Sequence, residues 1–354
     1  MVPFIYYFLL AHVGAAQALS LQVWTRKFYH GLLELRAESQ EGRIEIPVFN
    51  DLAKQHLSIN IMVGTPPQQF SVMPDTASPF LWLPSATSPA CTPNCPLPVW
   101  NPNGSSTAVD IHTVFNVSYG LTPDNIMLGE YYNDIISIGG VAVPQYPLAL
   151  VEVIDTIYEA QTWGIMGLGS DLTNDQEGTI LFGGIDESKA EGELKSAPLT
   201  FTEWSVNLTS LEPVISGTYN TILDTGSPNM YVPQALYDTI AEPLNVTLRT
   251  YRNTPYVPCS LRSSADSLHF EFAGKDRAER PEVRVPYSEI IYPFGMPANL
   301  GEVRSENGTE LCYLGILSNG GAPIFLLGNT FIRSAYVVYD ADALELRIAQ
   351  SRWS

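Results

Sequence analysis

The chain has few charged residues, and positive charge is the scarcer kind. Only 16% of its 354 residues are charged, with 18 Lys and Arg against 37 Asp and Glu, which gives a formal net charge of −19. Proteins that bind nucleic acid need a basic surface, so this composition argues against that class of partner. The excess of carboxylates repels itself at neutral pH, and because protonation relieves the repulsion, the balance suits an acidic working environment.

Long hydrophobic runs are also scarce. The run MVPFIYYFLLAHVGAA, followed by the small-x-small pattern Ala16-Gln17-Ala18, predicts a signal peptide over residues 1–18. A basic residue before the run is missing, so a buried N-terminal helix or strand is the alternative. The run is too short to favour a membrane-spanning helix, and the C-terminal ELRIAQSRWS offers no hydrophobic tail for a lipid anchor. We therefore expect a secreted, extracellular protein without a membrane anchor, with a vacuolar location as the alternative.

Cysteine is limited to four residues, a number that suits two disulfides. Of the three pairings that four cysteines allow, we favour Cys91–Cys95 across the turn CTPNC and Cys259–Cys312 closing a long loop. A zinc site is the competing interpretation, but the C-x3-C motif has no histidine nearby, so we expect no metal. Five N-x-S/T sequons agree with export and mark candidate glycosylation sites: Asn103, Asn116, Asn207, Asn245 and Asn307.

Short apolar runs recur along the chain, for example LSINIMVG, IISIGGVAV and WSVNLTSL. Gly, Pro, Asn and Asp turns separate them, and the 27 prolines and 26 glycines are spread out rather than clustered. This pattern predicts an all-β protein with one clear helix over residues 233–245, PQALYDTIAEPLN. Residues 19–44 are more basic than the rest and are interpreted as a short removable pro-segment or an irregular arm.

One motif occurs twice. FSVMPDTASPFLWLP at residues 70–84 and NTILDTGSPNMYVP at residues 220–233 share an apolar run, Asp-Thr-small-Ser-Pro, and an apolar and aromatic exit. Each is followed later by an apolar-apolar-Gly segment: Ile165-Met166-Gly167 and Leu326-Leu327-Gly328. A two-fold repeat predicts two similar lobes that face each other, which would bring Asp75 and Asp224 together at the junction.

Two carboxyl groups that meet have a specific chemistry. Like charges a few Å apart cannot both ionise, so such a pair holds one proton over a wide acidic range. The ionised member can take a proton from a water molecule while the protonated member donates to a carbonyl oxygen, and this hydrolyses an amide. The serine-hydrolase motif G-x-S-x-G is absent.

The chain resembles the pepsin-like aspartic proteases (peptidase A1), and most of all fungal secreted members, over about residues 45–350. The ordered matches are IMVGTPPQQF, DTAS with Trp82 downstream, CTPNC, Tyr119-Gly120, LFGGID, DTGS and LLGNTFIRSAYVVYD. The resemblance implies a bilobal all-β fold with an active-site cleft, formed by an N-terminal lobe (45–190) and a C-terminal lobe (191–354). It implies a monomeric endopeptidase that hydrolyses polypeptides at acidic pH with Asp75 and Asp224 as the catalytic dyad, without cofactor or metal.

The resemblance also gives roles to neighbours of the aspartates. Bracing threonines, carboxylate-orienting serines and one loop glycine are implied: Thr76, Ser78, Thr225, Gly226 and Ser227. A β-hairpin flap carrying Tyr119 and Gly120 would close over substrate, with Trp82 as the hydrogen-bonding neighbour of Tyr119. The plainer interpretations are an Asp turn for either motif alone, a strand-end tyrosine for Tyr119 and core packing for Trp82.

Several departures from the family pattern concern the first lobe. Ala77 stands where the family has glycine, and a methyl in a tight turn costs about 1 kcal/mol, more where φ is positive. Pro74 removes a backbone donor just before Asp75. The connection at residues 170–178 has only nine residues, and the flap lacks a glycine-rich tip. The short connection predicts an unpaired strand edge beside TILFGG.

Two functions are the alternatives to an active endopeptidase. One is a catalytically impaired pepsin-like protein that binds peptides or inhibits other proteins, and the other is a non-enzymatic β-sandwich adhesin.

Overall fold

The structure is a computed structural model that describes fifteen ranges of the chain. These are residues 44–51, 56–78, 80–88, 98–119, 126–154, 164–167, 177–182, 184–200, 204–212, 215–249, 254–276, 278–297, 300–322, 325–340 and 343–352. The predicted signal peptide, nearly all of the pro-segment or arm, Gly120, Cys91 and Cys95 lie outside the described residues.

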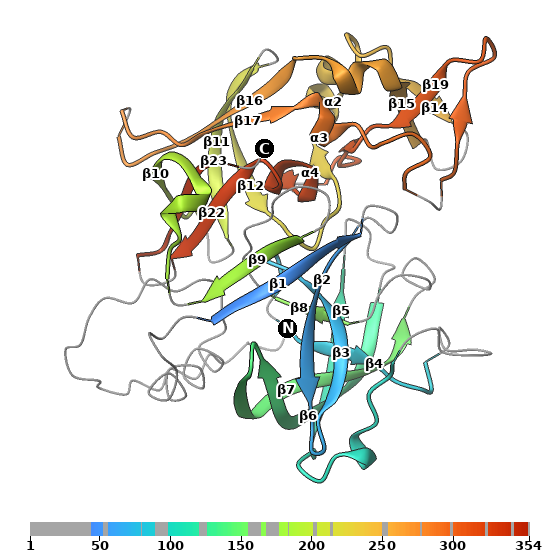
Figure 1. The fold of residues 1–354 in the computed structure, drawn as a ribbon, viewed down its shortest axis with the longest axis vertical. Coiled ribbons are helices and arrows are strands. Elements are labelled where there is room, and N and C mark those ends of the chain that lie inside the picture. The colour runs from blue at the N-terminus through green and yellow to red at the C-terminus, as the bar shows by residue number, and fades with distance from the viewer. Residues whose placement is uncertain are drawn as a thin grey trace.

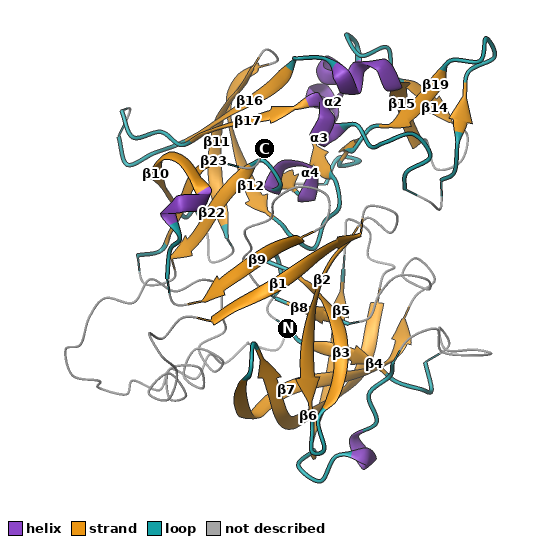
Figure 2. Cartoon of the chain, viewed as in Figure 1, coloured by secondary structure: helices purple, strands orange, loops and turns teal. Residues whose placement is uncertain are grey.

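Strands dominate both halves of the described chain (Figure 2), and the two halves form separate groups of sheets (Figure 1). The strands coloured blue to green lie together in the lower half of Figure 1, and those coloured yellow to red lie in the upper half. The all-β, two-lobed fold class expected from the sequence is therefore confirmed.

The first half is built on a nine-stranded sheet. Its order is β5-β6-β7-β4-β8-β3-β2-β1-β9. The strands, in chain order, are β1 (Ile44–Asp51), β2 (His56–Val63), β3 (Gln68–Pro74), β4 (Trp82–Pro84), β5 (Val109–Ser118), β6 (Ile126–Ile138), β7 (Val141–Ile154), β8 (Ile165–Met166) and β9 (Glu177–Phe182). A 3-10 turn, η3 (Pro102–Gly104), precedes β5.

The second half contains sheets of seven, four and three strands. Their orders are β17-β16-β11-β12-β21-β13-β20, β14-β15-β19-β18 and β10-β23-β22. The strands are β10 (Ala190–Pro198), β11 (Ser205–Glu212), β12 (Ile215–Leu223), β13 (Met230–Val232), β14 (Thr247–Arg249), β15 (Thr254–Pro258), β16 (Ser267–Phe272), β17 (Glu282–Pro286), β18 (Val303–Arg304), β19 (Glu310–Tyr313), β20 (Ile316–Ser318), β21 (Phe325–Leu327), β22 (Ala335–Asp340) and β23 (Glu345–Ser351).

The helices of the described chain are short, and all lie in the second half. They are α2 (Gln234–Ala241), α3 (Tyr287–Ile290) and α4 (Asn329–Ile332), with 3-10 turns η6 (Glu187–Lys189) and η7 (Cys259–Ser263). The helix predicted over residues 233–245 is α2, but it ends four residues early. Pro243 explains the end, because proline has no N–H to donate to the carbonyl oxygen of Thr239, four residues earlier. None of these helices is long and apolar enough to cross a membrane.

The sheets of the two halves repeat one arrangement around the two aspartate motifs. In the first half, β8 pairs in parallel with β3 and antiparallel with β4, and β4 pairs in parallel with β7. In the second half, β21 pairs in parallel with β12 and antiparallel with β13, and β13 pairs in parallel with β20. The internal repeat read from the sequence is thus also a repeat of strand pairing.

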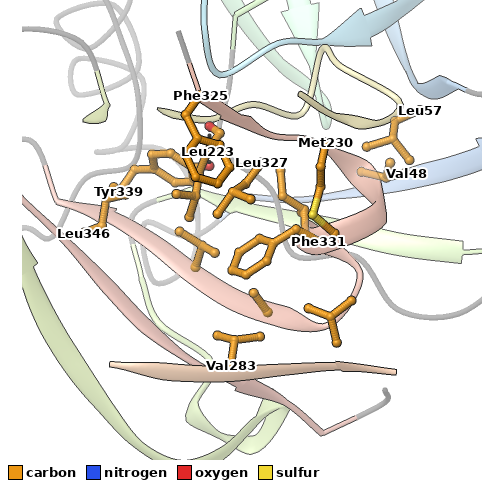
Figure 3. Packing of buried hydrophobic residues seen from close by; sticks show 14 of the residues in the cluster. Val48, Leu57, Leu223, Met230, Val283, Phe325, Leu327, Phe331, Tyr339 and Leu346 are labelled. Atoms are coloured by element: carbon orange, nitrogen blue, oxygen red, sulfur yellow. Dashed lines mark hydrogen bonds between the residues drawn. The ribbon is translucent and has the colours of Figure 1, made fainter. Parts of the chain in front are cut away.

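The core joins the two halves, because one cluster of buried side chains continues from the sheet of the first half into those of the second. Figure 3 shows Val48 and Leu57, from β1 and β2, on one side of Met230 and Phe331. Tyr339 and Leu346, from the three-stranded sheet, lie on the other side. The strands that lead into the two aspartate loops, β3 and β12, therefore belong to one continuous hydrophobic core.

Two further expectations concern the edge of the sheet and the cysteines. β9 ends the nine-stranded sheet, and among the described residues its strand partner is β1 alone. This is the open edge expected from the short connection before it.

Cys259 and Cys312 form the expected disulfide, with Cα atoms 4.9 Å apart, and this bond links η7 to β19. The expected Cys91–Cys95 bond lies outside the described residues and stays a prediction.

Candidate active site

The two aspartates occupy equivalent positions, each directly after a strand of the repeated arrangement. The amide N–H of Asp75, after β3, donates to the carbonyl oxygen of Met166 at 2.6 Å. The amide N–H of Asp224, after β12, donates to the carbonyl oxygen of Leu327 at 2.9 Å. Both side chains are buried, and their carboxyl groups lie close enough to hydrogen bond with each other. The structure thus brings together two carboxyl groups that are 149 residues apart in the sequence.

The apolar-apolar-Gly segments lie directly against these loops. A Cβ atom added to Gly167 would be 1.8 Å from the carbonyl oxygen of Ser78, and one added to Gly328 would be 2.3 Å from the carbonyl oxygen of Ser227. No larger residue fits at such distances. The glycines of the two segments are therefore required by the close approach of each loop to its neighbouring strand end.

Two threonines link the loops in a reciprocal arrangement. The amide of Thr76 donates to Thr225 Oγ1 at 3.0 Å, and the amide of Thr225 donates to Thr76 Oγ1 at 2.9 Å. Each hydroxyl then donates to a carbonyl of the opposite loop, Thr76 to Leu223 at 2.7 Å and Thr225 to Pro74 at 2.9 Å. All four bonds are buried, where a hydrogen bond is electrostatically stronger than in water, so the brace fixes the relative position of the two aspartates.

The loop departures leave the hydrogen bonds to the carboxylates in place. Ala77 N–H donates to Asp75 Oδ1 at 2.9 Å, just as Gly226 N–H donates to Asp224 Oδ1 at 2.8 Å. Neither Ala77 nor Gly226 has a positive φ, so the larger penalty considered for alanine does not arise. Pro74 lacks an N–H, but its carbonyl is an acceptor in the brace.

The two carboxyl groups differ in their surroundings. Burial raises the pKa of Asp75 well above its usual range, and the charge of Asp224 raises it further. Burial also raises the pKa of Asp224, but the Ser227 hydroxyl, which donates to Oδ2 at 2.5 Å, and the Gly226 N–H oppose this rise. The pKa values of both carboxyl groups are thus raised, and Asp224 is the better stabilised carboxylate of the two.

Tyr119 lies beside the first loop, in contact with Trp82, its expected neighbour, and with Ser78. Trp82 Nε1 donates to Tyr119 Oη at 3.1 Å, and Ser78 Oγ lies 3.4 Å from the same oxygen. Ser78 also hydrogen bonds to the carboxyl group of Asp75, and this bond opposes the rise in its pKa. Tyr119 follows the end of β5, and β6 returns beside β5 from Ile126 onward, so these strands form the expected hairpin up to its tip. Gly120 lies outside the described residues.

An aromatic cluster under this hairpin was not singled out from the sequence. The ring of Phe115 packs edge-on against Phe80 at 5.7 Å and against Tyr131 at 5.3 Å between ring centroids. These rings join Trp82 and Tyr119 in one apolar cluster. The alternating pattern of the strand VDIHTVFNVS was the available signal, but it does not show which face of the hairpin meets the aspartate loop.

The sequon asparagines differ in exposure. Asn207 is half-buried on β11, which lies between β16 and β12 inside the seven-stranded sheet. The other four are exposed: Asn103, Asn116, Asn245 and Asn307. Glycosylation at these positions stays a prediction. Among the described residues, no group of three or more His, Cys, Asp or Glu side chains is arranged to hold a metal ion.

The family described as "Eukaryotic aspartyl protease" matches the chain in two stretches, residues 56–174 and 170–351. The stretches meet within the short connection of the first lobe. Curated relatives include "Probable aspartic-type endopeptidase OPSB" of Arthroderma benhamiae, 27% identical over 352 residues, covering 83% of this chain and 68% of the relative. "Secreted aspartic protease 1" of Candida albicans is 26% identical over 373 residues, covering 90% and 88%. "Gastricsin" of Cavia porcellus is 28% identical over 323 residues, covering 79% and 76%.

Proposed function

The chain belongs to the eukaryotic aspartyl protease family, and this membership makes it an aspartic-type endopeptidase. We propose that it cleaves polypeptides at acidic pH, with Asp75 and Asp224 as its catalytic dyad. The observation that carries the proposal is the pair of buried, mutually hydrogen-bonded carboxyl groups held by the reciprocal threonine brace. Such a pair shares one proton, and that is the protonation state the reaction needs.

The reaction we propose uses the two carboxyl groups in different roles. Asp224, the better stabilised carboxylate, takes a proton from a water molecule, whose oxygen bonds to the carbonyl carbon of the peptide. Asp75 donates its proton to the carbonyl oxygen, which gives a neutral tetrahedral intermediate. The C–N bond then breaks as the proton on Asp224 passes to the leaving nitrogen and a hydroxyl proton of the intermediate returns to Asp75. The starting protonation state is restored.

Supporting roles follow from the contacts. Ser227 and the N–H groups of Ala77 and Gly226 would hold the carboxylate oxygens, and the threonine brace would hold the loops. Tyr119 and Gly120 would lie on the flap that covers the substrate and excludes water, and Trp82 would hydrogen bond to Tyr119 from β4. The aromatic cluster beside the flap favours apolar side chains next to the scissile bond.

We also propose that the protein is a secreted, glycosylated monomer. A relative is named as a secreted protease, and the Cys259–Cys312 disulfide suits an oxidising compartment. Mass spectrometry of the protein from its culture medium, before and after enzymatic removal of N-glycans, tests secretion and glycosylation together. Recovery from the vacuolar fraction alone would contradict the extracellular location.

The experiment for the function is hydrolysis of an acid-denatured protein at about pH 3 to 4, with and without a pepstatin-type inhibitor. We expect cleavage into peptides that the inhibitor blocks. Inhibitor binding without cleavage would contradict the catalytic proposal and identify a peptide-binding relative. Absence of both binding and cleavage would contradict the proposed cleft itself.

A further inference from the structure

Tyr339 carries a buried hydroxyl group that has no role in the proposed reaction. It lies on β22, has no exposed surface, and its ring packs edge-on against Trp204 with centroids 5.2 Å apart. Its hydroxyl donates to the carbonyl oxygen of Leu223 at 3.3 Å. Figure 3 shows Tyr339 beside Leu223, the residue that directly precedes Asp224. Tyr339 therefore links the three-stranded sheet to the residue before Asp224.

The Leu223 carbonyl is also a member of the threonine brace. It accepts the hydroxyl of Thr76 at 2.7 Å, and Thr76 is itself a hydrogen-bond partner of Tyr339. The equivalent carbonyl of the other loop, Pro74, accepts Thr225. On the side that precedes Asp224, a tyrosine hydroxyl from a third element therefore joins the brace.

We propose that Tyr339 is a positioning residue for the dyad, which holds the Leu223 carbonyl against Thr76 and so fixes the loop of Asp224 relative to that of Asp75. The inference rests on the proposed function. Burial and the charges of Asp224 and Asp75 raise the pKa of Tyr339 far above the working range, so the hydroxyl remains a neutral donor throughout. A merely structural tyrosine would stabilise the fold without affecting the chemistry of the two carboxyl groups.

Tyr336 provides the matched control on the same strand. It is nearly as buried, and its hydroxyl accepts the amide N–H of Asp186 at 2.9 Å. Tyr339→Phe and Tyr336→Phe each remove one buried hydroxyl and keep the ring, so a structural role predicts similar losses of thermal stability from both. The pH dependence of kcat and KM separates the roles.

We expect Tyr339→Phe alone to lower kcat by about threefold to tenfold, the range of one net hydrogen bond, with KM nearly unchanged. We also expect the acidic limb of its pH profile to move to higher pH, because removing a polar group beside the carboxylates makes their surroundings less favourable to charge. Identical pH profiles and kcat for the two variants would overturn the inference. Failure of Tyr339→Phe to fold while Tyr336→Phe folds would also overturn it, by assigning the hydroxyl to the fold.

Binding of a pepstatin-type inhibitor, measured by calorimetry against pH, reports on the dyad without turnover. If the wild-type protein binds inhibitor but does not cleave, the proposed function fails, while a pH dependence altered in Tyr339→Phe and not in Tyr336→Phe still supports the positioning role. If the wild-type protein cleaves and both variants bind inhibitor identically across pH, only the inference about Tyr339 fails.

Discussion

Position 226 has room for glycine only, because the two carboxyl groups approach each other beside it. A Cβ atom there would lie 2.5 Å from Asp75 Oδ1 and 3.1 Å from Asp224 Oδ1. The equivalent residue of the first loop, Ala77, carries a methyl group that is exposed rather than enclosed. The two loops are therefore similar in hydrogen bonding but not in the space they leave around the dyad.

We predict that Gly226→Ala lowers kcat/KM by about 100-fold or more, since a displacement of about 1 Å in a reacting group has that effect. Ala77→Gly, the reciprocal change, should leave kcat/KM within a few-fold of the wild-type value, because the N–H that holds Asp75 is retained. Steady-state kinetics on a short chromogenic peptide measures both. Wild-type activity in Gly226→Ala would show that the carboxyl groups are not as close as described.

Ser227 tests the asymmetry of the pair. Its hydroxyl donates to Asp224 and lowers the pKa of that carboxyl group, so Ser227→Ala should raise the pKa. Because the reaction needs Asp224 ionised, the acidic limb of the kcat/KM profile should then move to higher pH. Ser227→Thr keeps the hydroxyl and should keep the wild-type limb. A limb that Ser227→Ala does not move would mean that Asp224 does not titrate there.

At the scale of elements, the β5–β6 hairpin is linked to the first aspartate loop through Tyr119. We predict that Tyr119→Phe lowers kcat/KM by about tenfold, since the hydrogen bond from Trp82 and the contact with Ser78 are both lost. Tyr237→Phe, a change on α2 outside this hairpin, serves as the control and should have little effect. Equal activities for the two variants would contradict the flap role.

A cluster of charged side chains at the start of β23 has its own pH dependence. Burial favours a higher pKa for Glu345, but hydrogen bonds from Lys275 and Ser196 and the charges of Lys275 and Arg347 outweigh it, so the pKa is lowered. A lowered pKa gives stability that is present above the ordinary value of a glutamate and is lost as the pH falls through the folded value.

Glu345→Gln should therefore reduce the free energy of unfolding more at about pH 6.5 than at about pH 3. Urea unfolding at the two pH values measures the difference. Glu310→Gln, which removes a half-exposed partner of Arg304, is the control and should change stability little at either pH. An equal loss from Glu345→Gln at both pH values would contradict the lowered pKa.

The sequence predicts a feature of this structure when a recognisable motif marks it, and fails when contacts between distant segments decide it. The repeated Asp-Thr-small-Ser-Pro motif predicted that Asp75 and Asp224 meet, because a two-fold repeat implies the geometry. The order of the nine-stranded sheet could not be predicted, since strand pairing is decided by contacts between segments distant in the chain. The role that we propose for Tyr339 also escaped, because its strand AYVVYD is buried throughout and no alternation marks one side chain.

At the scale of the whole molecule, the departures from the family pattern that we identified all lie in the first half, whereas the motifs of the second half match the pattern. β9, which ends the nine-stranded sheet in the described part of the chain, and the boundary of the two-part family match both lie next to the short connection. The site nevertheless has its hydrogen bonds in both loops, and the core continues from one half to the other. The large negative charge would fall as carboxylates take up protons, which agrees with the acidic working pH that we propose.

The central claim is that two carboxyl groups, one from each lobe, share a proton and activate water. It is tested most directly by kcat/KM against pH for the wild-type protein and for Asp75→Asn and Asp224→Asn. The account predicts a bell-shaped wild-type profile in the acidic range. It also predicts that each variant folds but loses about 1,000-fold in kcat/KM. Retention of wild-type activity by both variants would contradict it.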